Sequence, residues 1–321
     1  RFAAGRIALD EAAARAALQR GVGAALRMDD HWAAAGIAEI VEENMANAAR
    51  VHAIERGKSI RDCTMIAFGG GAPLHAARLA GKLGIGRVLV PAGAGVGSAI
   101  GFLRAPIAFE VVRSDASVLL EADAATLNDR LGAMQAEAHA VVAPAARGIG
   151  VAERDLLVDR LAELRYQGQG HELRVPLPQG ALNHAALRQL AEDFESAYQR
   201  VYGLRVPGSR IEVVTWSVTV ATPHAAVRAV TMHEGVAPAG PRGHRPVWDP
   251  SRAETLPHAL HRRAELAPGA PVIGPALIEE DETTTVVPPG WRARCDDAGH
   301  LVLDVMPEGE PAEPGQVEGT M

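Results

Sequence analysis

The chain has 321 residues, of which 48% are hydrophobic and 4% aromatic, and its formal net charge is −7. This length can bury one large core or roughly two to three ordinary ones. The negative charge argues against nucleic-acid binding, which uses a basic surplus or stripe. The sequence has no run of about 18 uncharged apolar residues and no charged-then-apolar leader, which argues against a membrane span and against secretion.

Two cysteines, Cys63 and Cys295, stand outside any Cys-x-x-Cys or Cys/His cluster. Their isolation favours a reduced, cytoplasmic setting and argues against a metal site. Residue 1 is Arg, and an Ala-rich helical pattern follows directly. We expect a piece of a longer polypeptide, with a processed N-terminus as the alternative.

Helices and strands alternate in the pattern of the first hundred residues. The second helix carries apolar residues at intervals of three and four, at Ile37, Val41, Ala48 and Val51, and Gly57 is its stop signal. The alternation is typical of an α/β nucleotide-binding lobe. In chain order, the expected elements are a helix at 9–27, a helix at 32–56, a strand at 63–68, a glycine turn at 69–73, a helix at 74–83, a strand at 87–90 and a helix at 96–103.

The pattern changes after this lobe. Residues 211–222 alternate, which places Val214, Trp216, Val218 and Val220 on one face of a strand. From Arg245 onward, short strands between Pro/Gly turns predict an antiparallel, sandwich- or barrel-like module. The other expected elements are strands at 106–114, 158–166 and 171–175 and helices at 124–146 and 185–202.

We therefore expect an α/β fold with further modules. The predicted division is a nucleotide-binding lobe at 1–115, a connecting helix at 116–150, an α+β module at 151–232, a β-rich module at 233–305 and a disordered tail at 306–321. The tail is predicted from its Pro/Gly/Glu-rich composition, which has almost no apolar residues to bury.

The glycine turn Phe68-Gly69-Gly70-Gly71-Ala72-Pro73-Leu74-His75 carries the strongest chemical signal. Consecutive glycines between a strand and a helix expose backbone N–H groups, with no Cβ to block a phosphate or the sugar and base of a nucleotide. The spacing matches neither the Rossmann fingerprint nor the P-loop, and a purely structural turn is the alternative. A second cluster contains Gly93, Gly95 and Gly97. It is either a closely packed loop or a second wall of the same cleft, with Ser98 as a polar contact.

Three single residues are candidates for catalysis. Asn44 falls on the apolar stripe of helix 32–56, either for helix packing or for a contact in the cleft. Arg50 either binds phosphate or pairs with Glu43 or Glu55. His75 opens the helix after the glycine turn, where the helix dipole favours a neutral imidazole that acts in catalysis or in capping.

Other polar groups have structural alternatives. The set Arg165, Gln167 and Gln169 predicts an inter-domain hydrogen-bond network or, less strongly, a substrate site. The acidic run at 279–282 resembles a carboxylate metal cluster, but consecutive acids before a strand are usually solvated. His258 and His261 have metal-ligand spacing only on a helix, which the surrounding sequence does not support.

Several motifs resemble the hydantoinase A/oxoprolinase family, in order along nearly the whole chain to about Leu303. They are Glu43-Asn44-Met45, Ala67-Phe68-Gly69-Gly70, Pro73-Leu74-His75-Ala76, Arg165-Tyr166-Gln167-Gly168-Gln169 and Gly274-Pro275-Ala276. One departure is Gly71-Ala72 where the family usually has Ala-Gly, which puts the geometry of the turn in doubt.

The resemblance implies the second lobe of an actin/sugar-kinase-like ATPase fold, with Mg²⁺ and ATP as cofactors and Gly69, Gly70 and Gly71 against the adenosine. The phosphate loop of the first lobe is absent from this sequence. The implied activity is ATP-dependent hydrolysis of a cyclic amide such as a hydantoin or 5-oxoproline, within a homo- or hetero-oligomer completed by a hydantoinase B-type subunit. The alternatives are a subunit of an ATP-dependent ketone carboxylase and a non-catalytic scaffold.

Overall fold

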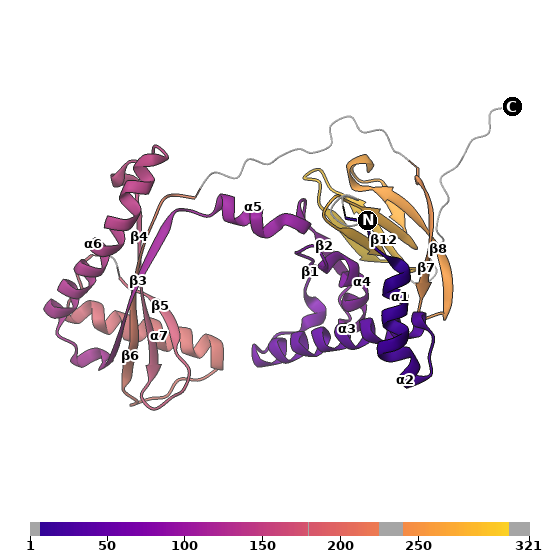
Figure 1. The fold of residues 1–321 in the computed structure, drawn as a ribbon. Coiled ribbons are helices and arrows are strands. Elements are labelled where there is room, and N and C mark those ends of the chain that lie inside the picture. Colours follow the sequence, from indigo (N-terminus) through magenta and orange to yellow (C-terminus); the bar gives the residue numbers. More distant parts are fainter. Residues whose placement is uncertain (1–6, 179, 225–239, 308–321) are drawn as a thin grey trace. The chain divides into compact units, whose positions relative to one another are not determined.

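A computed structural model describes residues 7–178, 180–224 and 240–307. The fold is mixed α/β and contains three sheets among these residues. The chain divides into two compact units (Figure 1). Unit 1 comprises Arg1–Leu103 with Arg228–Met321, and unit 2 comprises Arg104–Val227.

The helices of unit 1 lie close to the positions that the sequence predicts. The first of them is interrupted. The expected helix at 9–27 is divided into α1 (Glu11–Leu18), a π-helical turn and α2 (Ala24–Leu26), and it ends at Arg27 in the left-handed conformation. Asp29 then caps α3 (Asp30–Glu55) by accepting a hydrogen bond from the Trp32 N–H at 2.8 Å. The remaining helices of the unit are α4 (Ala72–Leu83) and α5 (Gly97–Arg104).

Two sheets complete unit 1. The five-stranded sheet has the order β1-β2-β13-β12-β9, and the four-stranded sheet has the order β11-β10-β8-β7. The strands of the first are β1 (Met65–Ile66), β2 (Arg87–Val90), β9 (Pro271–Ile273), β12 (Trp291–Cys295) and β13 (Leu301–Val305). Those of the second are β7 (Gly243–Asp249), β8 (Glu254–Arg262), β10 (Ala276–Glu279) and β11 (Thr284–Val287). Because β8 and β10 pair in parallel, the predicted all-antiparallel module is wrong in this detail.

One hydrophobic core joins the two sequence halves of unit 1. Strand β2 pairs with β13, so that Val88 lies opposite Leu303 and Val90 opposite Leu301, all of them buried. The predicted lobe at 1–115 and the predicted module at 233–305 therefore share a sheet instead of standing apart. Strand β1 has two residues and β2 has four, and two such short strands cannot form a stable sheet without further strands.

Helix α3 turns a different face inward from the one its pattern predicts. Ile37, Val41 and Val51 are exposed, at 42%, 43% and 54%. Its buried residues are Ala33, Glu42 and Ala46. Small side chains suit this face because α4 packs against it, and the two helices lie side by side in Figure 1.

Unit 2 is a four-stranded antiparallel sheet with two helices packed on it. The order is β3-β6-β4-β5, formed by β3 (Ala108–Val118), β4 (Leu157–Tyr166), β5 (Leu173–Pro176) and β6 (Ile211–Ala221). Helices α6 (Ala124–Gly148) and α7 (His184–Tyr202) add Met134 and Phe194 to the core around Trp216. The predicted connecting helix at 116–150 is therefore part of this unit.

The alternation in β6 is interrupted at Val214. Both neighbouring strands skip this residue, and Val213 is buried in its place, together with Trp216, Val218 and Val220. A bulge shifts the register by one residue, which the sequence pattern does not reveal.

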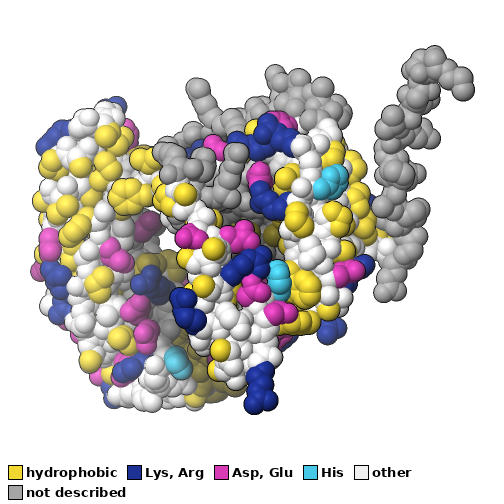
Figure 2. Space-filling view, turned by 45° about the vertical axis from the view of Figure 1, so that its right-hand side comes forward, with side chains coloured by type: hydrophobic (Ala, Val, Ile, Leu, Met, Phe, Trp, Pro, Cys, Tyr) yellow, Lys and Arg dark blue, Asp and Glu magenta, His cyan; other side chains and the backbone are white. Residues whose placement is uncertain are grey.

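The surface agrees with the charge of the sequence. On the face shown in Figure 2, basic side chains are scattered among acidic ones. None of the described helices is long and apolar enough to cross a membrane. Most of the predicted tail at 306–321 lies outside the described residues.

Candidate functional site

The two glycine clusters lie together in unit 1. Gly69 has a φ of 116°, a conformation that favours glycine, and its N–H donates to the Ala94 carbonyl at 2.9 Å. Gly71 is the N-cap of α4, so the N–H groups of the first turn of that helix begin directly after it. The hydrogen bond between Gly69 and Ala94 brings the two clusters together. That they form two walls of one nucleotide cleft stays a prediction.

The glycines of this region have two different roles. A Cβ at Gly95 would lie 2.6 Å from the Glu282 Cβ, and a Cβ at Gly97 would lie 2.2 Å from the Phe68 ring. Those glycines are needed for close packing. At Gly69 and Gly71 no atom lies within 4 Å of the added Cβ, so the turn is open there to an incoming group.

Neighbouring loop residues hold Gly70 in place. The Thr283 hydroxyl donates to the Gly70 carbonyl at 2.7 Å, and the Glu282 carbonyl lies 3.6 Å from where a Gly70 Cβ would be. Ser98 is exposed on α5. The positions of Gly69 and Gly71 are thus open, while Glu282 lies against Gly70 and Gly95.

A buried ion pair lies behind the loop that supports Gly70. Arg263 is 6% exposed and donates to both oxygens of Glu280 at 3.0 Å. The same guanidinium donates to the carbonyls of Val90 and Gly299. Burial raises the pKa of the Glu280 carboxyl above its ordinary value, against the opposing effect of Arg263. Sequence reasoning missed Arg263, which no motif marks.

Two other residues of the acidic run pair with arginines. Glu279 accepts from Arg245 at 2.9 Å, and Asp281 accepts from Arg262 at 2.9 Å. Within the described ranges, no group of three or more His, Cys, Asp or Glu side chains is arranged to hold a metal ion. His258 and His261 lie on strand β8, and burial lowers the pKa of the His261 imidazole.

His75 belongs to a network of charges between α3 and α4. Its Nδ1 lies 3.2 Å from Oε1 of Glu42, which is 2% exposed, and Arg78 donates to the other Glu42 oxygen at 2.9 Å. Lys82 bonds Glu39 and Glu43. The hydrogen bond from Lys82 lowers the pKa of both carboxyls. Glu42 thus fixes the imidazole at the first turn of α4.

Arg50 and Asn44 lie further along α3. Arg50 bonds the Asn47 side chain at 2.8 Å and the Lys82 carbonyl at 2.9 Å, and its guanidinium is 3.7 Å from Glu43. This geometry favours the pairing role over phosphate binding. Asn44 is exposed on α3. The structure therefore brings together His75 and the glycine turn, but not Asn44.

The polar group at the end of β4 has its side-chain partners within unit 2. Arg165 pairs with Glu212 at 2.5 Å, and the Gln169 amide donates to the Tyr198 hydroxyl at 3.0 Å. These contacts link β4 to β6 and the residues after β4 to α7, all within unit 2.

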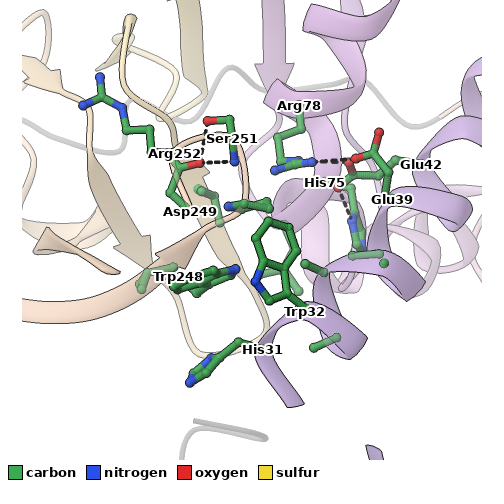
Figure 3. A pocket seen from close by; sticks show the side chains of 18 of the residues that line it. His31, Trp32, Glu39, Glu42, His75, Arg78, Trp248, Asp249, Ser251 and Arg252 are labelled. Atoms are coloured by element: carbon green, nitrogen blue, oxygen red, sulfur yellow. Dashed lines mark hydrogen bonds and ion pairs between the residues drawn. The ribbon is translucent and has the colours of Figure 1, made fainter. Parts of the chain in front are cut away.

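A large pocket lies beside the first turns of α4. It has a volume of about 1300 Å³ and is lined by α1, α3, α4 and the β7–β8 ribbon of unit 1. Figure 3 shows Trp248 and His31 on one side of it and His75, Glu42 and Arg78 on the other. Sequence reasoning did not find this pocket, because its walls come from two segments, residues 11–82 and 247–289, that are far apart in the chain.

We predict that Glu42→Ala lowers the free energy of unfolding by about 2–3 kcal/mol, because a buried carboxylate with two partners is lost. Urea denaturation at neutral pH measures the change. Glu55→Ala, an exposed position at the end of the same helix, is the control and should change stability by less than about 0.5 kcal/mol. Equal effects of the two substitutions would contradict a structural role for Glu42.

Known proteins are similar to this chain in sequence and in structure. The alpha subunit of caprolactamase from Pseudomonas jessenii is 29% identical over 93% of this chain and 43% of its own length. The crystal structure of ATP-dependent caprolactamase from that organism matches with a TM-score of 0.63 at 28% identity, over 94% of this chain and 44% of its own. A nucleotide-free structure of acetone carboxylase matches with a TM-score of 0.68 at 25% identity, over 95% of this chain and 44% of that one.

The chain thus spans less than half the length of these relatives. Two family models match it. The model described as hydantoinase/oxoprolinase matches residues 1–111, and the model of the hydantoinase/oxoprolinase C-terminal domain matches residues 121–304. Their order agrees with the motifs found along the sequence. The chain belongs to the hydantoinase/oxoprolinase family.

Proposed function

We propose that this chain is part of an ATP-dependent enzyme that hydrolyses a cyclic amide in the cytoplasm. Residues around β1, α4 and β2 would form the second lobe of an actin/sugar-kinase-like ATPase fold. Gly69 and Gly71 would contact the nucleotide, which brings Mg²⁺ with it. The observation that carries the proposal is the open glycine turn at the N-terminus of α4, because backbone N–H groups there can donate to a ligand without a side chain in the way.

The proposed reaction has three steps. The γ-phosphoryl group of ATP passes to the ring carbonyl oxygen and ADP leaves. Water then attacks the carbon and the ring C–N bond breaks, which leaves the amine and an acyl phosphate. A second water hydrolyses the acyl phosphate to the carboxylate and phosphate. Such transfer needs donors and metal ligands placed around the phosphoryl group. A hydantoinase B-type subunit would complete the enzyme. The relative from Pseudomonas jessenii is named the alpha subunit of caprolactamase, a name that implies at least one other subunit in that enzyme.

A ketone carboxylase is the second candidate, favoured by the match to acetone carboxylase. It shares the nucleotide requirement but uses bicarbonate in place of water as the second reactant. The dependence on bicarbonate therefore separates the two functions.

The test uses the full-length gene product with its partner subunit. We expect ATP-dependent opening of a hydantoin, 5-oxoproline or a seven-membered lactam, at a rate that does not change when bicarbonate is stripped from the buffer. Product amino acid and ADP are measured together. Failure to open any of the rings, with bicarbonate-dependent turnover of a ketone, would replace the hydrolase with the carboxylase.

A further inference from the structure

We propose that the pocket between α1, α3, α4 and the β7–β8 ribbon binds an uncharged, apolar carbonyl compound. Its identity as the cyclic amide substrate rests on the proposed function. The pocket has a volume of about 1300 Å³, enough for a small ring with room to spare. Every described residue that lines it belongs to unit 1.

One wall of the pocket is aromatic and apolar. The rings of Trp32 and Trp248 meet edge to face with centroids 5.7 Å apart, and the His31 ring lies 5.4 Å from Trp248. Met28, Pro288 and Pro289 extend this wall. Faces of this kind bind an apolar ring through dispersion and the hydrophobic effect. The wall therefore selects the hydrocarbon part of a ligand.

The same wall holds one hydrogen-bond donor with nothing to donate to. The indole Nε1 of Trp248 is buried and has no partner among the described residues. A buried donor without an acceptor is costly, and ligand pockets are places where such a donor is satisfied on binding. A carbonyl oxygen is the acceptor that an apolar ring compound can bring.

Charged side chains that line the pocket have hydrogen-bond or ion-pair partners within the chain. Arg15 bonds Asp30, Arg78 bonds Glu42, and Lys82 bonds Glu39. Asp249 accepts from the N–H and the hydroxyl of Ser251, and Arg252 lies 3.7 Å from Glu254. Since these charges already have partners, a charged ligand would gain no ion pair here and would lose its hydration. The lining thus favours a neutral compound.

The pocket also begins close to the glycine turn. His75, which lines it, follows Gly71 by four residues on α4, which is about 6 Å along the helix axis. The α4 side of the pocket, opposite Trp248, is therefore the side nearest to the turn.

The experiment measures binding of a seven-membered lactam to the full-length gene product by calorimetry without nucleotide. We expect Trp248→Phe, which keeps a ring but removes the donor, to weaken binding about three- to tenfold. Trp216→Phe is the matched control. It also removes an indole N–H, which donates to Asp115 at 3.0 Å in unit 2, and lactam affinity should not change.

Two further probes sharpen the result. The seven-membered cyclic ketone should bind with the same dependence on Trp248 if the carbonyl alone is recognised, and a preference for the lactam supports the amide. The ring-opened amino acid, which is charged, should bind at least tenfold more weakly. Equally tight binding of the charged product, or lactam binding that Trp248→Phe leaves unchanged, would overturn the proposal.

A readout on the unmodified protein covers the case in which Trp248→Phe does not fold. Saturating lactam should move the Trp248 indole N–H signal downfield in a nitrogen–proton correlation spectrum, as expected when the group gains an acceptor, and leave that of Trp216 in place. An unmoved Trp248 signal counts against the pocket. Lactam that binds in this way but is never opened with ATP would refute the proposed function and not the pocket.

Discussion

Replacing Arg263 by Met is expected to lower the free energy of unfolding by about 3–5 kcal/mol. The substitution keeps an apolar side chain of similar length but leaves the Glu280 carboxylate buried without its bidentate partner. The carbonyls of Val90 and Gly299 lose a donor at the same time. Urea denaturation compares the variant with the parent chain.

Arg262→Met is the matched control, one residue away. Its guanidinium pairs at 2.9 Å with Asp281, whose side chain is 55% exposed, so the loss should stay below about 1 kcal/mol. Similar losses in both variants would show that Arg263 contributes no more than a surface pair.

The effect of Arg263→Met should also depend on pH. Arg263 lowers the pKa of Glu280 against the larger effect of burial, so its removal raises that pKa further. A carboxyl with a raised folded pKa contributes stability below its unfolded value, 4.5, and loses it as the pH rises through the folded value. The destabilisation should therefore be smaller below pH 4.5 than at about pH 8.

Gly71→Val is expected to weaken ATP binding by the full-length gene product tenfold or more, without loss of fold. The φ of Gly71 is −95°, which valine tolerates, and no atom lies within 4 Å of the new Cβ. The side chain would instead occupy space beside the first N–H groups of α4, where the nucleotide is proposed to lie. Calorimetric titration with ATP measures the affinity.

Gly81→Val provides the control on the same helix. Gly81 also has open space at its Cβ, but it lies about 15 Å from Gly71 along the axis of α4. ATP affinity should stay within twofold of the parent value. If Gly71→Val binds ATP as the parent does, the turn has only a structural role. Gly69 is unsuitable for this test, because its φ of 116° would strain any larger residue.

Helix ends and turns that are marked by nearby capping residues or glycines could be predicted from the sequence. Gly84, in the left-handed conformation, ends α4 as expected, and the glycine turn stands between β1 and α4. Helices α6 and α7 begin at Asp123 and Asn183 caps, close to the predicted positions. Such signals need only the neighbouring residues, so a single sequence contains them.

Other features depend on residues far apart in the chain. The contacts of Arg263 and the walls of the pocket around Trp248 depend on which strands pair with each other. No local sequence pattern specifies that pairing. The inward face of α3 was predicted wrongly because larger apolar residues and small ones recur on different sides of the helix. Periodicity alone does not say which side meets α4, where Ala46 is buried.

The pairing of β2 with β13 also constrains the order in which the chain can fold. Unit 2 is continuous in sequence, so during synthesis its sheet can close once β6 has emerged. In unit 1, β2 cannot pair with β13 until Leu301–Val305 leave the ribosome, more than two hundred residues after β2 has been synthesised. Val88 and Val90 lack their β13 partners through that interval, so apolar surface of the nascent lobe stays exposed until synthesis is nearly finished.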